Sequence, residues 1–303
     1  RVCNLSYAQT DWYIYQQQCP LYNAPGLPIS WNKNQYQEGT NEYVAVRPEL
    51  KKQIEELYRK HPEEARDSFG EDPFEVKNIL KYWVLSEKQE FHVIPTDTIN
   101  IHIDKDALLR SGIMHPKTIR HLKGEDLKDA IPDKLYIPLT DIRMLTKVDL
   151  LMLEMLANCN WERPLYLAIS VGSVSKLKFD NYFVQEGLAF RFTPFDYKKW
   201  GDVGENRLYA VDVERLYDNV MNRYKYGGLD TPGLYLDETT LRTCWYHRRL
   251  FAQLAKELIA QGDNERAKKV LAYAEQVIPG YNVPETHESG SYDIATAYAA
   301  LGE

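Results

Sequence analysis

Apolar side chains recur at helical spacing in several segments, most of which begin with a residue that favours a helix start. Pro48 and Pro73 suit first-turn positions, and Thr10 and Thr146 are favourable N-caps. After each of these residues, apolar positions follow three or four residues apart. The pattern predicts helices over residues 11–18, 48–61, 73–83, 146–157 and 213–224.

Shorter apolar or alternating runs predict strands over residues 1–6, 91–103, 134–139, 165–171 and 188–193. The apolar run Leu165–Val171 is typical of a central parallel strand that is covered on both faces. Phe190 and Phe192 alternate with Arg191, which indicates a strand nearer an edge. The helical stretch predicted between these two strands, up to Gln185, is long enough for a right-handed βαβ crossover. We therefore predict an α/β fold, with a mostly parallel sheet flanked by helices.

The C-terminal part has a purely helical period, so we expect two domains, 1–235 and 236–303. Small and large apolar residues there match the tetratricopeptide template, with a turn at Gly262-Asp263 between two helices and Pro279 at the end. A second register begins at Ser291. An ordinary helical hairpin is the alternative, because the same spacing suits general helix packing. Since such stacks need about three repeats, we expect the segment to lean on the α/β domain or to continue beyond Glu303.

Composition and charge describe a folded protein: 44% of the 303 residues are hydrophobic and 27% are charged. The formal net charge of −7 provides no overall attraction for phosphate backbones, so we expect no nucleic-acid partner. The longest apolar stretches are shorter than the roughly 20 residues that span a bilayer. The chain begins with Arg1 and not with Met, which we interpret as a piece of a longer protein.

Motifs for a metal, a cofactor or a nucleophile are not found. The sequence has no Gly-rich phosphate loop, no G-x-S-x-G and no H-E-x-x-H, so we predict no cofactor and assign no catalytic residue. The cysteines lack C-x-x-C spacing; a disulfide between Cys3 and Cys19 is the one pairing suggested by proximity, with buried thiols as the alternative. His102 and Asp104 share one face of a predicted strand but have no third ligand, and we predict no metal site.

Two predicted strand ends carry the candidate ligand-binding residues. Ligands of open α/β sheets bind beyond the carboxyl ends of strands, where loops enter helices. The side chains and backbone groups at those two places are the candidates, namely Asn4, Ser6, Thr10, Asp11, Gly172 and Ser173. The alternative is that Thr10 and Ser173 only cap helices.

Trp161, Glu162 and Arg163 form a polar and aromatic cluster just before the predicted central strand. This position is the amino end of the strand, opposite the edge where ligands usually bind. We therefore predict a structural role, in which Trp161 covers the core while Glu162 and Arg163 pair with neighbouring loops.

Three ordered motifs carry a family resemblance that covers most of residues 1 to about 240. They are N-L-S with T-D-W-Y-I at Asn4–Ile14, N-W-E-R-P-L-Y-L-A at Asn160–Ala168, and E-G-L-A-F-R at Glu186–Arg191. Together they resemble the C-terminal extracytoplasmic region of bacterial membrane proteins that are similar to protein O-mannosyltransferases and are classed with family-117 glycosyltransferases.

The resemblance implies that a membrane-embedded half, carrying the lipid-linked donor site and an acidic catalytic residue, precedes this chain. It places the chain at the periplasmic face of the inner membrane. The leading hypothesis is an accessory domain, itself without a catalytic residue, whose partners are its own N-terminal membrane domain and a protein or peptide acceptor. The second hypothesis is a protein-interaction module with helical repeats and no role in sugar transfer. A third, weaker hypothesis is an enzyme in its own right, with its site near Asn4 and Gly172.

Overall fold

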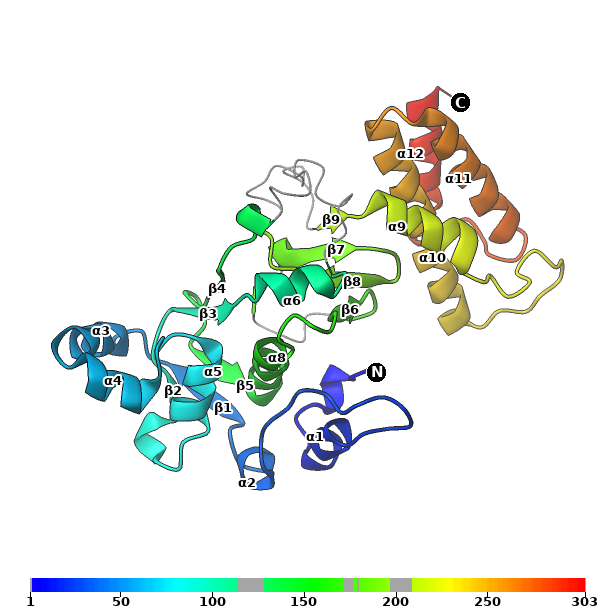
Figure 1. Cartoon of the computed structure of the whole chain (residues 1–303). Helices are drawn as coiled ribbons and strands as arrows, with labels where there is room; N and C mark the ends of the chain where they lie inside the picture. The colour runs from blue at the N-terminus through cyan, green and yellow to red at the C-terminus, as the bar shows by residue number, and fades with distance from the viewer. Residues whose placement is uncertain (1, 114–127, 172–176, 179, 197–208, 303) are drawn as a thin grey trace.

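A computed structural model describes residues 2–113, 128–171, 177–178, 180–196 and 209–302. Figure 1 shows small sheets and short helices through most of the chain, followed by a separate group of longer helices at the C-terminus. The first half contains the elements η1 (Leu5–Tyr7), α1 (Asp11–Gln18), α2 (Lys33–Tyr36), β1 (Tyr43–Val46), α3 (Leu50–Lys60), α4 (Pro62–Phe69), α5 (Val76–Ile79), the π-helical turn η2 (Leu80–Val84), η3 (Gln89–Phe91), β2 (Val93–Ile94), β3 (Thr98–His102), α6 (Lys105–Arg110), β4 (Lys134–Pro138) and β5 (Met144–Thr146).

The second half of the chain begins with the most buried helix of the α/β part and ends with the helical group. Its elements are α8 (Lys147–Asn158), β6 (Tyr166–Ala168), η4 (Asp180–Tyr182), β7 (Phe183–Gln185), β8 (Ala189–Phe192), β9 (Ala210–Val211), α9 (Val213–Asp218), the π-helical turn η5 (Asn219–Arg223), α10 (Glu238–Ala260), α11 (Asn264–Val277), η6 (His287–Ser289) and α12 (Ser291–Leu301). The predicted helices at 11–18, 48–61, 73–83, 146–157 and 213–224 are confirmed, with α4 following α3 directly after His61.

The strands of the described residues form three small sheets, with the orders β2-β1-β5, β3-β4 and β6-β8-β7-β9. Only the β1–β2 and β7–β9 pairings are parallel; the other pairings are antiparallel. The prediction of one mostly parallel sheet is therefore wrong for this part of the chain. The strands are two to five residues long, too short for their sequence pattern to specify a partner or a direction.

The apolar run at Leu165–Val171 is an edge strand and not a central one. Within it β6 pairs with β8 alone among the strands that the structure describes, in antiparallel register from Tyr166 opposite Arg191, and its side chains alternate between exposed and half-buried. The helix predicted up to Gln185 is also wrong over its last residues, because β7 occupies 183–185 and forms a hairpin with β8. A short link containing Gly187, at φ 148°, joins the two strands, and a three-residue link with glycine is a hairpin signal that favours antiparallel pairing.

The predicted first strand is also replaced by local structure. The Asn4 side chain accepts a hydrogen bond from the backbone N–H of Ser6, and the 3-10 turn η1 follows. Asparagine side chains compete in this way with ladder hydrogen bonds. The strand predicted over 91–103 is interrupted as well, because η3, β2 and β3 divide it.

Helix α8 is the central element of the first core. Thr146 and Asp149 form a reciprocal capping box at its start, as the Thr146 N-cap predicts. Lys147 is buried but satisfied, since its Nζ lies 2.6 Å from Glu42 Oε1 and donates to the carbonyls of Tyr36 and Gln37. These contacts fix the loop before β1 to the helix.

Two hydrophobic clusters divide the described residues. The first spans Ala8 to Ala210, and the second spans Val213 to Ala297. Helix α9 thus packs with the C-terminal helices, although it precedes residue 235 in the chain. The domain boundary at 235 stays a prediction. Helices α10 and α11 form an antiparallel hairpin across Gly262, at φ 79°, and the buried positions that fit the tetratricopeptide template are Phe251, Leu254, Ala255, Leu258, Ala267 and Leu271.

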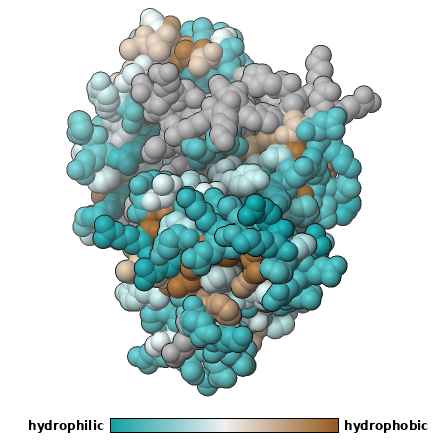
Figure 2. Space-filling view, turned by 90° about the vertical axis from the view of Figure 1, so that its left-hand side faces the viewer, coloured by the Kyte–Doolittle hydropathy of each residue, from teal (hydrophilic) through white to brown (hydrophobic). Residues whose placement is uncertain are grey.

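The pole of the molecule formed by α3 and α4 is strongly charged. Figure 2 shows the side of the molecule on which these helices lie, and most of that face is hydrophilic. Ile54 and Ala65 are the buried residues of α3 and α4, so the two helices contribute little to the core. Their lysine, arginine and glutamate side chains form a solvated surface.

Candidate functional site

The predicted N-terminal site residues lie together and form hydrogen bonds with residues of the same turn. Asn4 N donates to Tyr13 Oη at 2.6 Å, and Thr10 Oγ1 donates to the carbonyl of Tyr7 at 2.8 Å. Asp11 Oδ1 accepts from its neighbour's backbone N–H at 2.7 Å. These bonds fix the turn between η1 and α1, and a ligand there stays a prediction. Gly172 and Ser173, the other predicted positions, lie outside the described residues.

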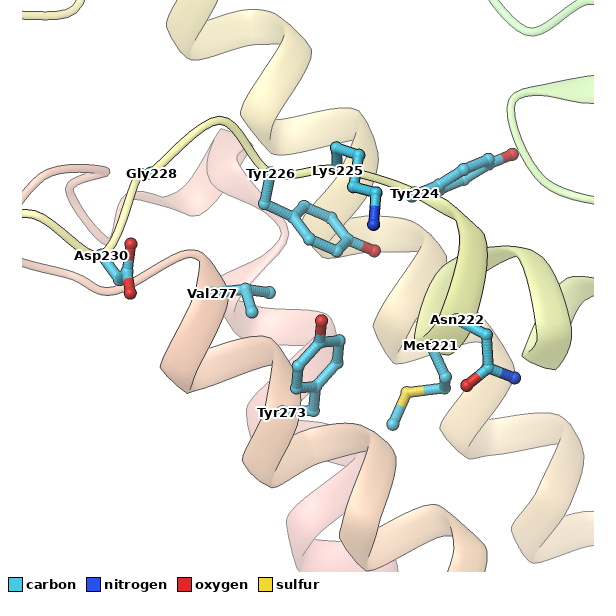
Figure 3. A pocket seen from close by; sticks show the side chains of 9 residues that line it. All are labelled: Met221, Asn222, Tyr224, Lys225, Tyr226, Gly228, Asp230, Tyr273 and Val277. Atoms are coloured by element: carbon cyan, nitrogen blue, oxygen red, sulfur yellow. The ribbon is translucent and has the colours of Figure 1, made fainter.

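A polar pocket of about 210 Å³ lies between η5, the loop that follows it, and α11. Figure 3 shows the side chains around it, with Tyr226 above Tyr273 and with Lys225 and Asp230 on the loop to either side of Tyr226. The helices contribute Met221, Asn222 and Val277 to the walls. The volume suits one amino-acid side chain or a molecule of similar size.

The loop that closes this pocket is held from both ends. Tyr226 Oη donates to the carbonyl of Val220 at 2.7 Å. Asn282 Nδ2, on the segment after α11, donates to the carbonyls of Leu229 at 2.7 Å and Thr231 at 2.6 Å. Tyr281 Oη donates to the carbonyl of Asp230 at 2.6 Å. The pocket is therefore formed before any ligand binds, which lowers the entropy lost on binding.

Tyrosine rings form the interior of the pocket. Tyr226 and Tyr273 are nearly perpendicular, at 81° with centroids 6.1 Å apart, and Tyr226 also packs on Phe251. Burial, with smaller contributions from Tyr273 and Tyr224, raises the pKa of Tyr226 above its usual value. Its hydroxyl therefore stays a neutral hydrogen-bond donor at physiological pH. The ring faces of Tyr226 and Tyr273 offer apolar contact, and the side-chain amide of Asn222 offers hydrogen bonds.

The rim of the pocket carries two opposite charges that can bind a ligand. Lys225 and Asp230 are exposed at its rim, so they can meet an ammonium, a carboxylate or a peptide group of a ligand. Among the residues that the structure describes, no group of three or more histidine, cysteine or carboxylate side chains is suited to hold a metal ion. In the same part of the chain, Cys3, Cys19, Cys159 and Cys244 are thiols; Cys159 and Cys244 are buried, and Cys3 and Cys19 are half-buried.

A second hollow of about 340 Å³ lies beside the first, between α10, α11 and α12. Arg248 supports its floor, because its guanidinium donates to the carbonyls of Ile278 at 3.2 Å and Val283 at 2.7 Å. Glu275 and Glu285 lie at the wall. The hollow gives the helical segment a mildly acidic concave surface.

His247 supports the pocket from behind and makes it sensitive to pH. Its ring meets Tyr224 and Tyr226 edge-on, at 5.6 and 5.4 Å, and burial lowers its pKa. The unfolded imidazole, with a pKa of about 6.5, therefore binds protons more readily than the folded one. Stability is complete above that pH and is lost as the pH falls toward the lower, folded pKa.

We expect His247→Gln to reduce this loss of stability in acid. Urea unfolding at pH 7.5, 6.5 and 5.5 measures the free energy of unfolding at each pH. His61→Gln is the matched control, because His61 is exposed. An equal loss of stability in the wild type and His247→Gln between pH 6.5 and 5.5 would contradict the assignment.

A buried ion cluster joins the pocket's helices to the last sheet. Arg191 on β8 lies 2.9 Å from Glu186 and 3.5 Å from Asp212. Arg215 on α9 adds a second cation at 2.8 Å from Glu186, and Asp212 also caps α9 by accepting from the N–H of Arg215. Glu186 and Arg191 are the first and last residues of the E-G-L-A-F-R motif. The motif therefore has a structural role, which is to fix the direction in which α9 leaves the sheet.

Sequence reasoning missed the pocket. Tyr226-Gly227-Gly228 marks a break in the helical pattern, and the positive φ of both glycines agrees with a turn there. The contacts from Asn282 and Tyr273 come from about 50 residues further along the chain. A tyrosine-rich turn before a long helix is the local signal that could have indicated the site.

The structure thus defines a mixed α/β unit joined to a helical segment that carries a preformed binding pocket. Residues 1–214 match the family model described as TMEM260-associated domain 2, and the chain belongs to that family. No curated protein and no solved structure matches the chain. No helix in the described ranges has the length and apolar character that crossing a membrane requires.

Proposed function

We propose that this chain is an extracytoplasmic accessory domain of a membrane glycosyltransferase and that it helps to present protein acceptors to the catalytic membrane half. The family match over residues 1–214 is the observation that carries the proposal, because the family is described as a TMEM260-associated domain. The three motifs of the glycosyltransferase resemblance lie in the matched region. A periplasmic location is part of the proposal.

The pocket supports acceptor binding in particular. It is preformed, it fits one side chain, and Lys225 and Asp230 flank Tyr226 on its rim. An extended peptide offers carbonyl acceptors and N–H donors on either side of each side chain, which suits a rim with one cation and one anion. We therefore place the acceptor peptide across this loop, with one side chain between Tyr226 and Tyr273.

A second candidate function is a protein-interaction module that is independent of sugar transfer. One observation favours it: both hollows are lined by residues from Met221 onward, beyond the family match that ends at 214. The helical segment can thus serve a partner of its own. Tetratricopeptide-like stacking of α10, α11 and α12 belongs to this proposal.

The charge-reversed double variant Lys225→Glu/Asp230→Lys tests the leading proposal in the full-length membrane protein. We expect sugar transfer to the protein acceptor to fall about tenfold, the effect of losing roughly 1.4 kcal/mol of binding energy, with an unchanged melting temperature because both side chains are exposed.

The matched control is Lys52→Glu/Glu55→Lys, which reverses two exposed charges on α3. Deletion of residues 1–303 should abolish or redirect transfer. Unchanged transfer to every acceptor after the deletion would refute the accessory role. If the pocket variant loses a bound protein partner while transfer is intact, the interaction module is the better description.

A further inference from the structure

The N-terminal stretch of the chain is almost free of charge. Asp11 is the only charged side chain between Val2 and Asn32, in a protein in which 27% of the residues are charged. The same stretch is rich in tyrosine, tryptophan, asparagine and glutamine. Figure 1 shows α1 and the N-terminus at the lower edge of the molecule, apart from the charged helices α3 and α4 at its left end.

Four aromatic rings of this segment are exposed, and three of them lie on η1 and α1. Tyr7, Trp12 and Tyr15 expose 51%, 56% and 62% of their surface. Tyr7 and Trp12 are in contact, with ring centroids 6.0 Å apart. Trp12 and Tyr15 are three residues apart on α1 and therefore neighbours on one side of the helix. We call these three residues the aromatic face.

The opposite side of α1 is firmly anchored. Tyr13, Ile14 and Gln17 are buried. Gln18 Nε2 donates to the carbonyls of Ile29 at 3.2 Å and Trp31 at 2.6 Å. The aromatic face is thus carried on a rigid support, and its exposure does not come from a frayed end.

The chemistry of the aromatic face fits the headgroup layer of a bilayer. Tyrosine and tryptophan have an apolar body and a polar edge, and they are enriched where a membrane meets water. Asp11, which directly precedes Trp12, is the one charge in this stretch, so the cost of bringing charges toward a low-dielectric medium is limited to a single carboxylate. The face contains no lysine or arginine that would select anionic lipid or an acidic protein.

We propose that Tyr7, Trp12 and Tyr15 insert into the headgroup layer of a zwitterionic membrane and orient the domain on it. This inference rests on the proposed function, in which the chain is part of a membrane protein. Three rings bind weakly by themselves, but attachment to the same membrane raises their effective concentration, so weak contact is enough to set an orientation.

Partition of the 303-residue chain into phosphatidylcholine vesicles, measured by co-sedimentation over a range of lipid concentrations, tests the inference. We expect Tyr7→Gln/Trp12→Gln/Tyr15→Gln to lower the partition coefficient about tenfold or more, because membrane affinity scales with the apolar area that is buried. Tyr43→Gln/Tyr235→Gln/Tyr292→Gln removes three exposed rings elsewhere and should leave partition unchanged. Circular dichroism confirms that each variant is folded.

Equal partition of the wild type and the aromatic-face variant, or no partition at any lipid concentration, would overturn the inference. So would concentration-dependent dimerisation in sedimentation equilibrium that the same variant abolishes, since the face would then join two copies of the chain. Sugar transfer is read separately. If vesicle binding needs the aromatic face but transfer does not need residues 1–303, the proposed function fails and the membrane contact stands. If transfer needs residues 1–303 but vesicle binding does not need the aromatic face, the proposed function stands and the membrane contact fails.

Discussion

Replacing Arg191 with alanine should lower the free energy of unfolding by about 3 to 5 kcal/mol, the usual effect of removing one partner from a buried ion pair. Arg191 is 0% exposed, and its guanidinium lies against Glu186 and Asp212 while donating to the carbonyl of Ile113. The variant leaves these carboxylates buried without their main counter-charge. The loss is therefore larger than that of a surface ion pair.

Urea unfolding followed by circular dichroism measures this loss. Arg215→Ala is the matched control, since Arg215 contacts the same Glu186 and Asp212 but keeps 30% of its side chain exposed and should cost less. Arg191→Lys should recover only part of the stability, because an ammonium lacks the planar fork that reaches both acids. A loss below about 1 kcal/mol for Arg191→Ala would show that water or rearrangement satisfies the acids.

Trp161→Ala should cost a similar amount, about 3 to 5 kcal/mol, as for other large aromatic residues removed from a core. Trp161 is 3% exposed, its Nε1 donates to the carbonyl of His102 at 2.9 Å, and its ring stacks on Phe192 at 6.0 Å. It joins the end of α8 to β3 and β8. Its loss removes packing from three elements at once.

Thermal and urea unfolding separate the parts of this effect. Trp161→Phe keeps a ring but loses the hydrogen bond, which is worth about 1 kcal/mol. Trp12→Ala, at an exposed tryptophan, should change stability by less than about 0.5 kcal/mol. If Trp161→Ala were as mild as Trp12→Ala, the interpretation of Trp161 as a core residue would be wrong.

The structural interpretation of Trp161 and Arg163 is confirmed by their contacts. Trp161 covers the core, and Arg163 Nη1 donates to the carbonyl of Gly26 in a neighbouring loop at 3.1 Å. Glu162 is exposed, and its pairing with a loop stays a prediction. The turn that places them is unusual, because Asn160 and Trp161 both have positive φ, at 49° and 58°, a region that a bulky residue rarely adopts.

Helices were predictable because their signals are local. The Thr146 N-cap of α8 and the apolar stripe around Ile54 both lie within one or two turns of the helix they define. Each acts through bonds between residues three or four positions apart. The same locality explains why the α10–α11 hairpin, with its turn at Gly262, was expected from the sequence.

Strand pairing and the binding pocket were not predictable in this way. The apolar run at Leu165–Val171 indicated burial, but it contained no information on whether β8 would lie beside it or in which direction. The pocket depends on Asn282 reaching Leu229 and on Tyr273 meeting Tyr226. Contacts between residues this far apart form only when the helices between them have packed.

The sequence by itself determined most of the helices, the Thr146 cap of α8, the helical character of the C-terminal segment and the resemblance carried by the three motifs, since each is set by neighbouring residues. Only the tertiary structure decided that β6 is an antiparallel edge strand, that Glu186 and Arg191 meet Asp212 in a buried cluster, and that a tyrosine pocket and an exposed aromatic face lie on different parts of the molecule. The physical reason is that burial and pairing of charges depend on what the rest of the chain brings to the same place.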